Sequence, residues 1–169
     1  MKRNGFTLLE LLLVMGCVIL FMTFFISGIY MVKERSKDIY CINNLRNINV
    51  LMQIYLAASS EVLPIATAKP SLDLVPRPTL ADVLKPFGAN KMIFRCLADQ
   101  DNIFFISENS SYEYNETLCG RKIGYSKLFK IIGLKPWEIP VVYDFEPFHK
   151  GFSVTHKNYL WGDWHVGQL

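Results

Sequence analysis

Side chains that can bind metal ions or act as acids and bases concentrate near the carboxyl end of the chain. Imidazole and carboxylate groups are ligands for divalent metal ions. The carboxylates here are too sparse for an obvious calcium-binding loop. The alternative to a metal site is that Asp163 stabilises a turn and that His165 is a strand residue with a local hydrogen bond. The residues concerned are His149, His156 and His165, with Asp144, Glu146 and Asp163 nearby.

The four cysteines fall into two groups. Cys17 lies in a long apolar run, where a cysteine acts as a small hydrophobic residue. Cys41, Cys96 and Cys119 lie in the remainder of the chain. In an exported domain three thiols allow one disulfide and leave one free cysteine, and the spacing leaves the pairing open. The absence of a Cys-x-x-Cys motif or a Cys/His cluster in the sequence disfavours a metal site.

Catalytic motifs are missing from the sequence. It contains no Gly-x-Ser-x-Gly, no phosphate-binding glycine loop and no His-Glu-x-x-His. We therefore expect no enzymatic activity and no organic cofactor. Tyr159, Trp161 and Trp164 are typical of a core or a sheet edge, although exposed aromatic residues could also bind glycans.

One carboxylate stands at the beginning of the apolar run. Glu10 is the only charged residue between Phe6 and Val32. A charge at such a position is costly in lipid and is usually functional. A helix over these residues reaches roughly 40 Å, whereas a bilayer core is about 30 Å thick. The sequence therefore predicts a transmembrane helix over 6–32.

Two simpler interpretations of this segment are a secretory signal peptide, which fits poorly, and a plain signal anchor. A secretory signal peptide has an apolar region of about 7–15 residues followed by a small-residue cleavage site, and this run is longer and lacks that site. A plain signal anchor would tolerate Glu10 near the membrane interface. Charge does not set the orientation, because Lys2 and Arg3 precede the span and Lys33, Arg35 and Lys37 follow it.

The remainder of the chain is large enough for one small domain. The 169 residues carry a formal charge of +3, and without Lys2 and Arg3 they carry 16 basic and 15 acidic side chains. This near neutrality is unlike a nucleic-acid-binding surface, so we expect no nucleic-acid partner.

The residue pattern predicts that the helix continues beyond the membrane. No proline occurs before Pro64, and we expect one helix from 6 to about 58, with an amphipathic continuation over 33–60. Apolar residues recur there every three or four positions, which places them on one helix face. They are Cys41, Leu45, Ile48, Met52 and Tyr55.

The exported domain, 61–169, is predicted to contain short elements. A loop with four prolines covers 64–78, and a short helix over 79–88 begins at a Thr79 cap with Asp82 three residues later. Gly162 and Asp163 suit a tight turn with positive φ at its first position. The fold class is α+β, with the long helix against a small antiparallel sheet. Strands are expected at 91–96, 102–107, 111–115, 139–143, 152–156, 159–161 and 164–166.

The amino-terminal residues resemble a known signal. Lys2-Arg3, Gly5, Phe6-Thr7-Leu8-Leu9 and Glu10 are similar to the prepilin signal of type IV pilins and of the pseudopilins of type II secretion. The resemblance implies that a prepilin peptidase removes residues 1–5 by cutting after Gly5 and methylates the new amino terminus at Phe6. It also implies a pilin-like fold, an inner-membrane location and a periplasmic carboxyl-terminal domain.

The same resemblance implies a set of partners. These are membrane lipid, other pilin or pseudopilin subunits in a helical filament, and an inner-membrane assembly platform with its ATPase. Glu10 would pair with the incoming Phe6 amine of a neighbouring subunit, because either charge alone in a filament core is costly. Several pseudopilins bind Ca²⁺ near the carboxyl end, and Asp144 and Asp163 would be the ligands here.

Segments of the body resemble a bacterial group of prepilin-like proteins with a His…Asp-Gly tail. Trp164 replaces the glycine of that tail, and Leu97 and Glu113 also depart from the group's pattern. The resemblance implies a Cys41–Cys96 disulfide with Cys119 free. The similar segments are 41–48, 94–99, 111–115 and 163–166.

These observations lead to two main functional hypotheses, beside a further alternative of an envelope enzyme or lectin on the same anchor. The first is a pseudopilin-like or minor-pilin-like subunit of a type II secretion or type IV pilus-like filament. The alternative is a membrane-tethered envelope protein that binds a glycan or another ligand and uses the prepilin signal only for export.

Overall fold

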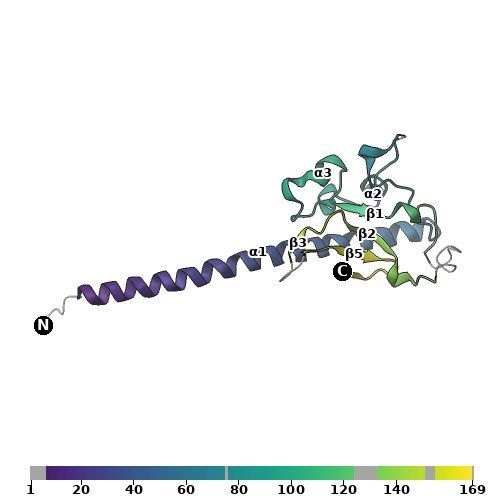
Figure 1. Cartoon of the computed structure of the whole chain (residues 1–169). Helices are drawn as coiled ribbons and strands as arrows, with labels where there is room; N and C mark the ends of the chain where they lie inside the picture. The colour runs from purple at the N-terminus through teal and green to yellow at the C-terminus, as the bar shows by residue number, and fades with distance from the viewer. Residues whose placement is uncertain (1–6, 75, 124–132, 151–154, 169) are drawn as a thin grey trace. The chain divides into compact units, whose positions relative to one another are not determined.

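The long amino-terminal helix expected from the sequence is present. The computed structural model describes residues 7–74, 76–123, 133–150 and 155–168, without the side chains of 26 and 27. Helix α1 runs from Leu8 to Ala58 (Figure 1). The chain divides into two units, Met1–Ser36 and Lys37–Leu169, and α1 contributes to both.

In the first unit the helix carries an uncovered apolar surface. Every described side chain from Thr7 to Val32 is exposed. The helix is long and apolar enough to cross a membrane, with a mean hydropathy of 2.6 over its most apolar window. Among the residues that the structure describes, α1 is the one helix with the length and composition to cross a membrane.

In the second unit the other half of α1 packs on a small antiparallel sheet. Cys41, Leu45, Ile48 and Met52 have no exposed surface, and they share a core with Val142 and Leu160 of the sheet. The expected apolar stripe is therefore the core face of the helix. The fold of this unit is α+β, as predicted.

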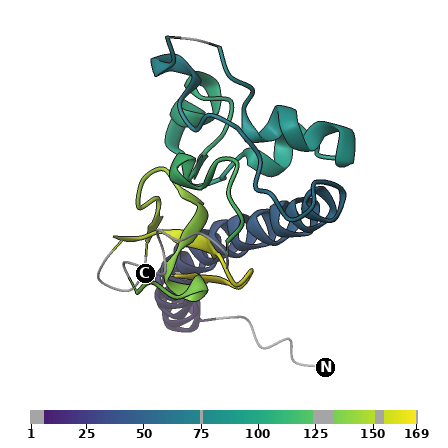
Figure 2. The same ribbon diagram turned by 90° about the vertical axis from the view of Figure 1, so that its right-hand side faces the viewer.

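Four strands form the main sheet in the order β1-β2-β5-β6, and all neighbours are antiparallel. Two further strands, β3 and β4, pair with each other. The α2 and α3 helices lie toward the β1 side and the carboxyl-terminal strands toward the other (Figures 1 and 2). The strands are β1 (Tyr112–Tyr114), β2 (Pro140–Asp144), β3 (His149–Lys150), β4 (Thr155–His156), β5 (Asn158–Trp161) and β6 (Val166–Gln168).

Short helices and 3₁₀ turns are spread over the described part of the segment between α1 and β2. The predicted cap is present at α2, where the Thr79 hydroxyl accepts from the Asp82 amide and the Asp82 carboxylate accepts from the Thr79 amide. The α-helices are α2 (Leu80–Leu84) and α3 (Ile103–Ser107). The 3₁₀ turns are η1 (Pro70–Leu72), η2 (Lys85–Phe87), η3 (Lys91–Phe94), η4 (Gln100–Asn102), η5 (Glu116–Leu118) and η6 (Pro136–Glu138).

Two predicted strands are wrong. Residues 91–94 form a 3₁₀ turn because the Asn90 side chain accepts from the Met92 amide, 3.0 Å away. Residues 103–107 form a helix, in which Ile103 and Ile106 lie exposed one turn apart. The Asp99 carboxylate accepts from the Phe105 amide at 3.1 Å and caps this turn. High β propensity in Ile and Phe is therefore overridden by local side-chain caps.

The predicted turn at Gly162-Asp163 is one residue longer than expected. The Trp161 amide donates to the His165 carbonyl at 3.0 Å. Three residues, 162–164, close this hairpin, and the positive φ of 71° falls on Trp164. Three-residue hairpin loops place their last residue in the left-handed region. The return strand therefore begins at Val166 rather than at Trp164.

Candidate functional site

The first turn of α1 contains the predicted assembly residue. The Glu10 carboxylate accepts hydrogen bonds from the Thr7 amide at 2.9 Å and from the Thr7 hydroxyl at 3.0 Å. The Thr7 hydroxyl in turn accepts from the Glu10 amide at 3.2 Å. This reciprocal arrangement is a capping box, which the sequence analysis missed although Thr7-x-x-Glu10 is its usual spacing. Gly5 and Phe6 lie outside the described residues.

Two cysteines tie the helix to the body. Cys41 of α1 and Cys96, which follows η3, are joined by a disulfide with a Cα–Cα distance of 5.4 Å. This is the pair that the resemblance implies. Cys119 is half-buried and free, and its thiol donates to the Ala66 carbonyl. Cys17 is exposed on the apolar half of α1.

A buried group of acidic and imidazole side chains lies next to this disulfide. We call it the Asp–His cluster: Asp38, Asp144, His149, His156 and Asn158. Within it Asp144, His149 and Asn158 are at most 1% exposed. Helix α1 supplies Asp38, strand β2 supplies Asp144, and β3, β4 and β5 supply the rest. The cluster therefore joins the helix to four strands.

His149 lies between the two carboxylates. Its Nε2 is 3.3 Å from Asp144 Oδ2, and its Nδ1 is 3.5 Å from Asp38 Oδ1. The same Nε2 is 3.4 Å from the Cys96 sulfur. Asp144 Oδ2 also accepts a hydrogen bond from the backbone amide of Asn158 at 2.7 Å. Both ring nitrogens of a buried histidine thus face charged or sulfur-bearing neighbours.

Several polar atoms of the cluster have no hydrogen bond. Asp144 Oδ1, His149 Nδ1 and Asn158 Oδ1 are buried and make none with any residue that the structure describes. A buried polar atom without a partner is costly and often marks a site for water or an ion. The cluster is therefore incompletely satisfied by the protein alone.

The surroundings of the two aspartates in the cluster shift their pKa values in opposite directions. Burial raises the pKa of Asp144, and the neighbouring His149 offsets this only in part. Burial also acts to raise the pKa of Asp38, but the Asn158 hydrogen bond and the His149 and His156 imidazoles outweigh it and lower that pKa. The difference arises because Asp38 has more partners that favour its charged form.

The structure does not bring together Asp144 and Asp163, the two residues expected to bind Ca²⁺. Asp144 ends β2, whereas Asp163 follows Trp161, which pairs with Pro140 at the other end of β2. Asp163 instead pairs with His165 on the exposed turn. Burial acts to raise the pKa of Asp163, but the hydrogen bonds and the charge of His165 outweigh it and lower that pKa. The simpler interpretation of a turn residue with a local hydrogen bond fits this geometry.

Among the described residues, three side chains are close enough to hold one metal ion: Cys41, Cys96 and His149. Sequence reasoning missed this group because 53 positions separate Cys96 from His149. It also missed Asp38. One signal was present, since Asp38 lies three residues before Cys41 and in phase with the apolar stripe of α1. A charged residue on a core face requires a buried partner.

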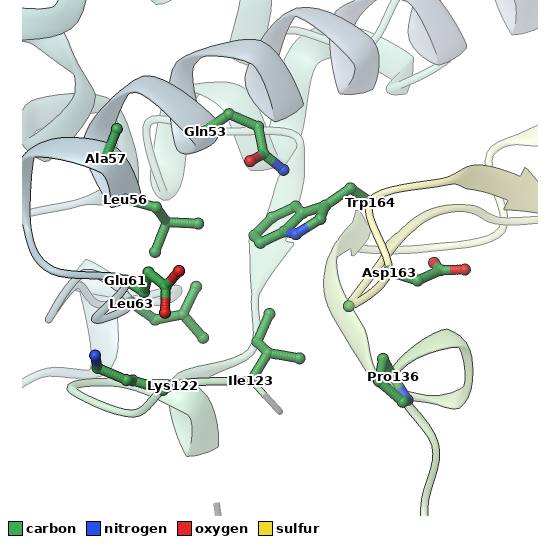
Figure 3. A pocket seen from close by; sticks show the side chains of 11 residues that line it. Gln53, Leu56, Ala57, Glu61, Leu63, Lys122, Ile123, Pro136, Asp163 and Trp164 are labelled. Atoms are coloured by element: carbon green, nitrogen blue, oxygen red, sulfur yellow. The ribbon is translucent and has the colours of Figure 1, made fainter. Parts of the chain in front are cut away.

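An open cavity of about 550 Å³ lies beside Trp164. In Figure 3 the Trp164 indole extends toward Gln53 and Leu56, and the Asp163 carboxylate points away from the cavity. The Asn49 side chain of α1 donates to the Trp164 carbonyl at 2.9 Å and holds the turn in place. The lining also includes Ala57, Glu61, Leu63, Lys122, Ile123, Pro136 and Gly162.

Comparisons with models of protein families, with curated proteins and with solved structures give no match for this chain. The functional interpretation therefore depends on the residues and geometry described above.

Proposed function

We propose that the chain is a pseudopilin-like subunit of a type II secretion or type IV pilus-like filament. A prepilin peptidase cuts after Gly5 and methylates Phe6, and the subunit then waits in the bacterial inner membrane with its second unit in the periplasm. An assembly platform and its ATPase move it into the filament. The proposed role is structural and includes no catalytic step.

The observation that carries the proposal is the position of Glu10. It stands in the first turn of a 51-residue helix, five residues after Gly5, and no other charge follows until Lys33. The described side chains between them are exposed and mostly apolar. Such a surface needs lipid before assembly and neighbouring helices afterwards.

The carboxylate would fix the axial position of each subunit. Cleavage after Gly5 creates a cationic amine at Phe6, and methylation leaves its charge. In a filament core this amine can pair with Glu10 of a neighbouring helix. Because an unpaired charge is strongly disfavoured there, the pair selects one axial register among the many that an apolar helix allows.

The capping box offers a competing explanation for Glu10. A glutamine at this position can still accept from the Thr7 amide, because Glu and Gln both serve in capping boxes. Charge pairing, in contrast, requires the carboxylate. The two explanations therefore predict different outcomes for Glu10→Gln.

We expect Glu10→Gln, Glu10→Ala and Glu10→Val to insert in the membrane normally and to lose filament assembly. Thr7→Ala is the matched control, since it removes the cap and keeps the charge, and we expect it to assemble. Membrane fractionation measures insertion, and the yield of sheared filaments measures assembly. Wild-type yield from Glu10→Gln would refute charge pairing.

The cavity beside Trp164 favours a second candidate, a tethered envelope protein that binds a glycan or another ligand. The aromatic ring of Trp164 and the polar groups of Gln53, Glu61 and Lys122 line this cavity and are suitable for such binding. Under this alternative the full chain would stay monomeric in crosslinking and Trp164→Ala would abolish glycan binding. Crosslinked ladders that survive Trp164→Ala would favour the filament subunit.

A further inference from the structure

We propose that the reduced chain binds Zn²⁺ at Cys41, Cys96, His149 and Asp144, and that the Cys41–Cys96 disulfide is the oxidised form of the same site. The inference is independent of filament assembly. It begins from the three buried side chains whose ligand atoms all lie within 4.8 Å of one another.

The distances around His149 Nε2 match a tetrahedral zinc site. Zinc bonds of about 2.3 Å to sulfur and about 2.0–2.1 Å to nitrogen place neighbouring ligand atoms roughly 3.5 Å apart. The Cys96 sulfur is 3.4 Å from His149 Nε2, and Asp144 Oδ2 is 3.3 Å from the same nitrogen. The three side chains whose ligand atoms all lie within 4.8 Å of one another are Cys41, Cys96 and His149, and Asp144 approaches them from the His149 side.

Asp144 can offer a carboxylate oxygen to the metal ion as a fourth ligand. Its Oδ2 already accepts from the Asn158 amide, which holds the carboxylate in place. Its Oδ1 is buried and makes no hydrogen bond with the described residues. A bound cation would compensate this buried carboxylate, whose charged form is otherwise disfavoured by burial.

Asp38 completes the arrangement as a positioning residue. Metal-bound histidines usually donate their second ring N–H to a carboxylate, which fixes the tautomer. Here His149 Nδ1 faces Asp38 Oδ1 at 3.5 Å while Nε2 faces the sulfur and Asp144. Asp38 is itself held by Asn158 and Gln168 at 3.0 Å each.

The two states interconvert by balanced steps. A dithiol or phosphine reductant gives two electrons to the disulfide and is itself oxidised, and the two sulfurs take up two protons. Zn²⁺ then displaces both thiol protons and binds the two thiolates as they move apart. Oxidation reverses this: a disulfide-bearing oxidant takes two electrons from the thiolates and two protons from solvent to become a dithiol, the S–S bond forms and Zn²⁺ leaves.

The order of these states follows from compartment chemistry. Cysteines are reduced where chains are synthesised and oxidise in the envelope. The second unit folds after export, so the zinc state would form there on cysteines that are still reduced and would hold α1 against β2 and β3 until the covalent link forms.

Cobalt titration of the full chain in detergent tests the proposal. With a phosphine reductant we expect one Co²⁺ per chain and thiolate-to-cobalt absorption in the near ultraviolet, which Zn²⁺ then abolishes. The oxidised chain should show neither. Absence of this band in the reduced wild-type chain would overturn the proposal, and this comparison requires no variant.

Matched variants locate the site. Cys119→Ser and Cys17→Ser should bind Co²⁺ as the wild type does, whereas Cys96→Ser and His149→Ala should lose the band. Asp38→Asn should weaken Co²⁺ affinity by about 10–100-fold and keep the thiolate band, as expected for a residue outside the ligand shell. Binding that disappears with Cys119→Ser, or survives Cys96→Ser, would also contradict the assignment.

Discussion

At the scale of single residues, the Asp–His cluster is the feature with the clearest physical consequences. Two carboxylates and two imidazoles share one buried volume between α1 and the sheet, and their partners are unequal. Asp38 lies near four groups, His149, His156, Asn158 and Gln168. Asp144 is more deeply buried, and one of its oxygens has no hydrogen bond to any described residue.

This asymmetry predicts opposite pH effects of two matched substitutions. The raised pKa of Asp144 gives stability at low pH that is lost as the pH rises through that pKa, so Asp144→Asn should gain stability relative to wild type as the pH rises above 3.8. The lowered pKa of Asp38 gives stability above 3.8 that is lost on acidification. Asp38→Asn should therefore be most damaging near neutral pH.

Urea unfolding of the oxidised full chain in detergent, between about pH 3 and pH 7, measures both effects. The unfolding free energy of each variant minus that of wild type is plotted against pH. Slopes of the same sign for the two variants would contradict the assigned environments.

Trp164 has a left-handed backbone conformation at a position where the prepilin-like group that the sequence resembles has glycine. Its φ of 71° is unusual for an aromatic residue. Trp164→Ala and Trp164→Gly both remove the indole, but only glycine relieves the backbone. We expect Trp164→Gly to be more stable than Trp164→Ala by about 1 kcal/mol in urea unfolding. Equal stability of the two variants would indicate an unstrained turn.

At the scale of elements, the disulfide is a covalent cross-link between α1 and the segment that follows η3. It joins residues 55 positions apart in sequence. Replacing both Cys41 and Cys96 by serine should cost about 2–4 kcal/mol of unfolding free energy. Cys119→Ser is the control, and we expect it to stay close to wild type in oxidising buffer without metal. A loss as large from Cys119→Ser would point to a different pairing in solution.

The elements also show which parts of the fold a sequence can predict. The apolar stripe of α1 and the Thr79–Asp82 cap depend on neighbours in sequence, and both were predicted. Residues 91–94 and 103–107 were predicted as strands from Ile and Phe content, and the caps from Asn90 and Asp99 that override this preference were overlooked.

The candidate sites divide in the same way. Glu10 stands out in a linear pattern because its significance depends on a long apolar context. The group of Cys41, Cys96 and His149 does not, because its members come together only in the tertiary structure, from α1, from the segment after η3 and from β3. The β2–β5 register separates Asp144 from Asp163, and no spacing rule in the sequence could supply that register.

At the scale of the whole molecule, the two units have different requirements. Residues 8–32 form a helix with an uncovered apolar surface, which is stable only in lipid or among other helices. Residues 37–169 have their own core. A filament subunit needs both properties, a helix that can exchange lipid for neighbouring helices and a body that keeps its fold during this exchange.

The proposed function depends on prepilin-type processing, and the mass of the amino-terminal peptide is its decisive test. The chain is produced in a bacterium that has a prepilin peptidase, purified from membranes and digested for mass spectrometry. We predict a first residue of Phe6 carrying one N-methyl group, with residues 1–5 absent. A membrane-bound chain that still begins at Met1, or that begins at any residue other than Phe6, would contradict the account.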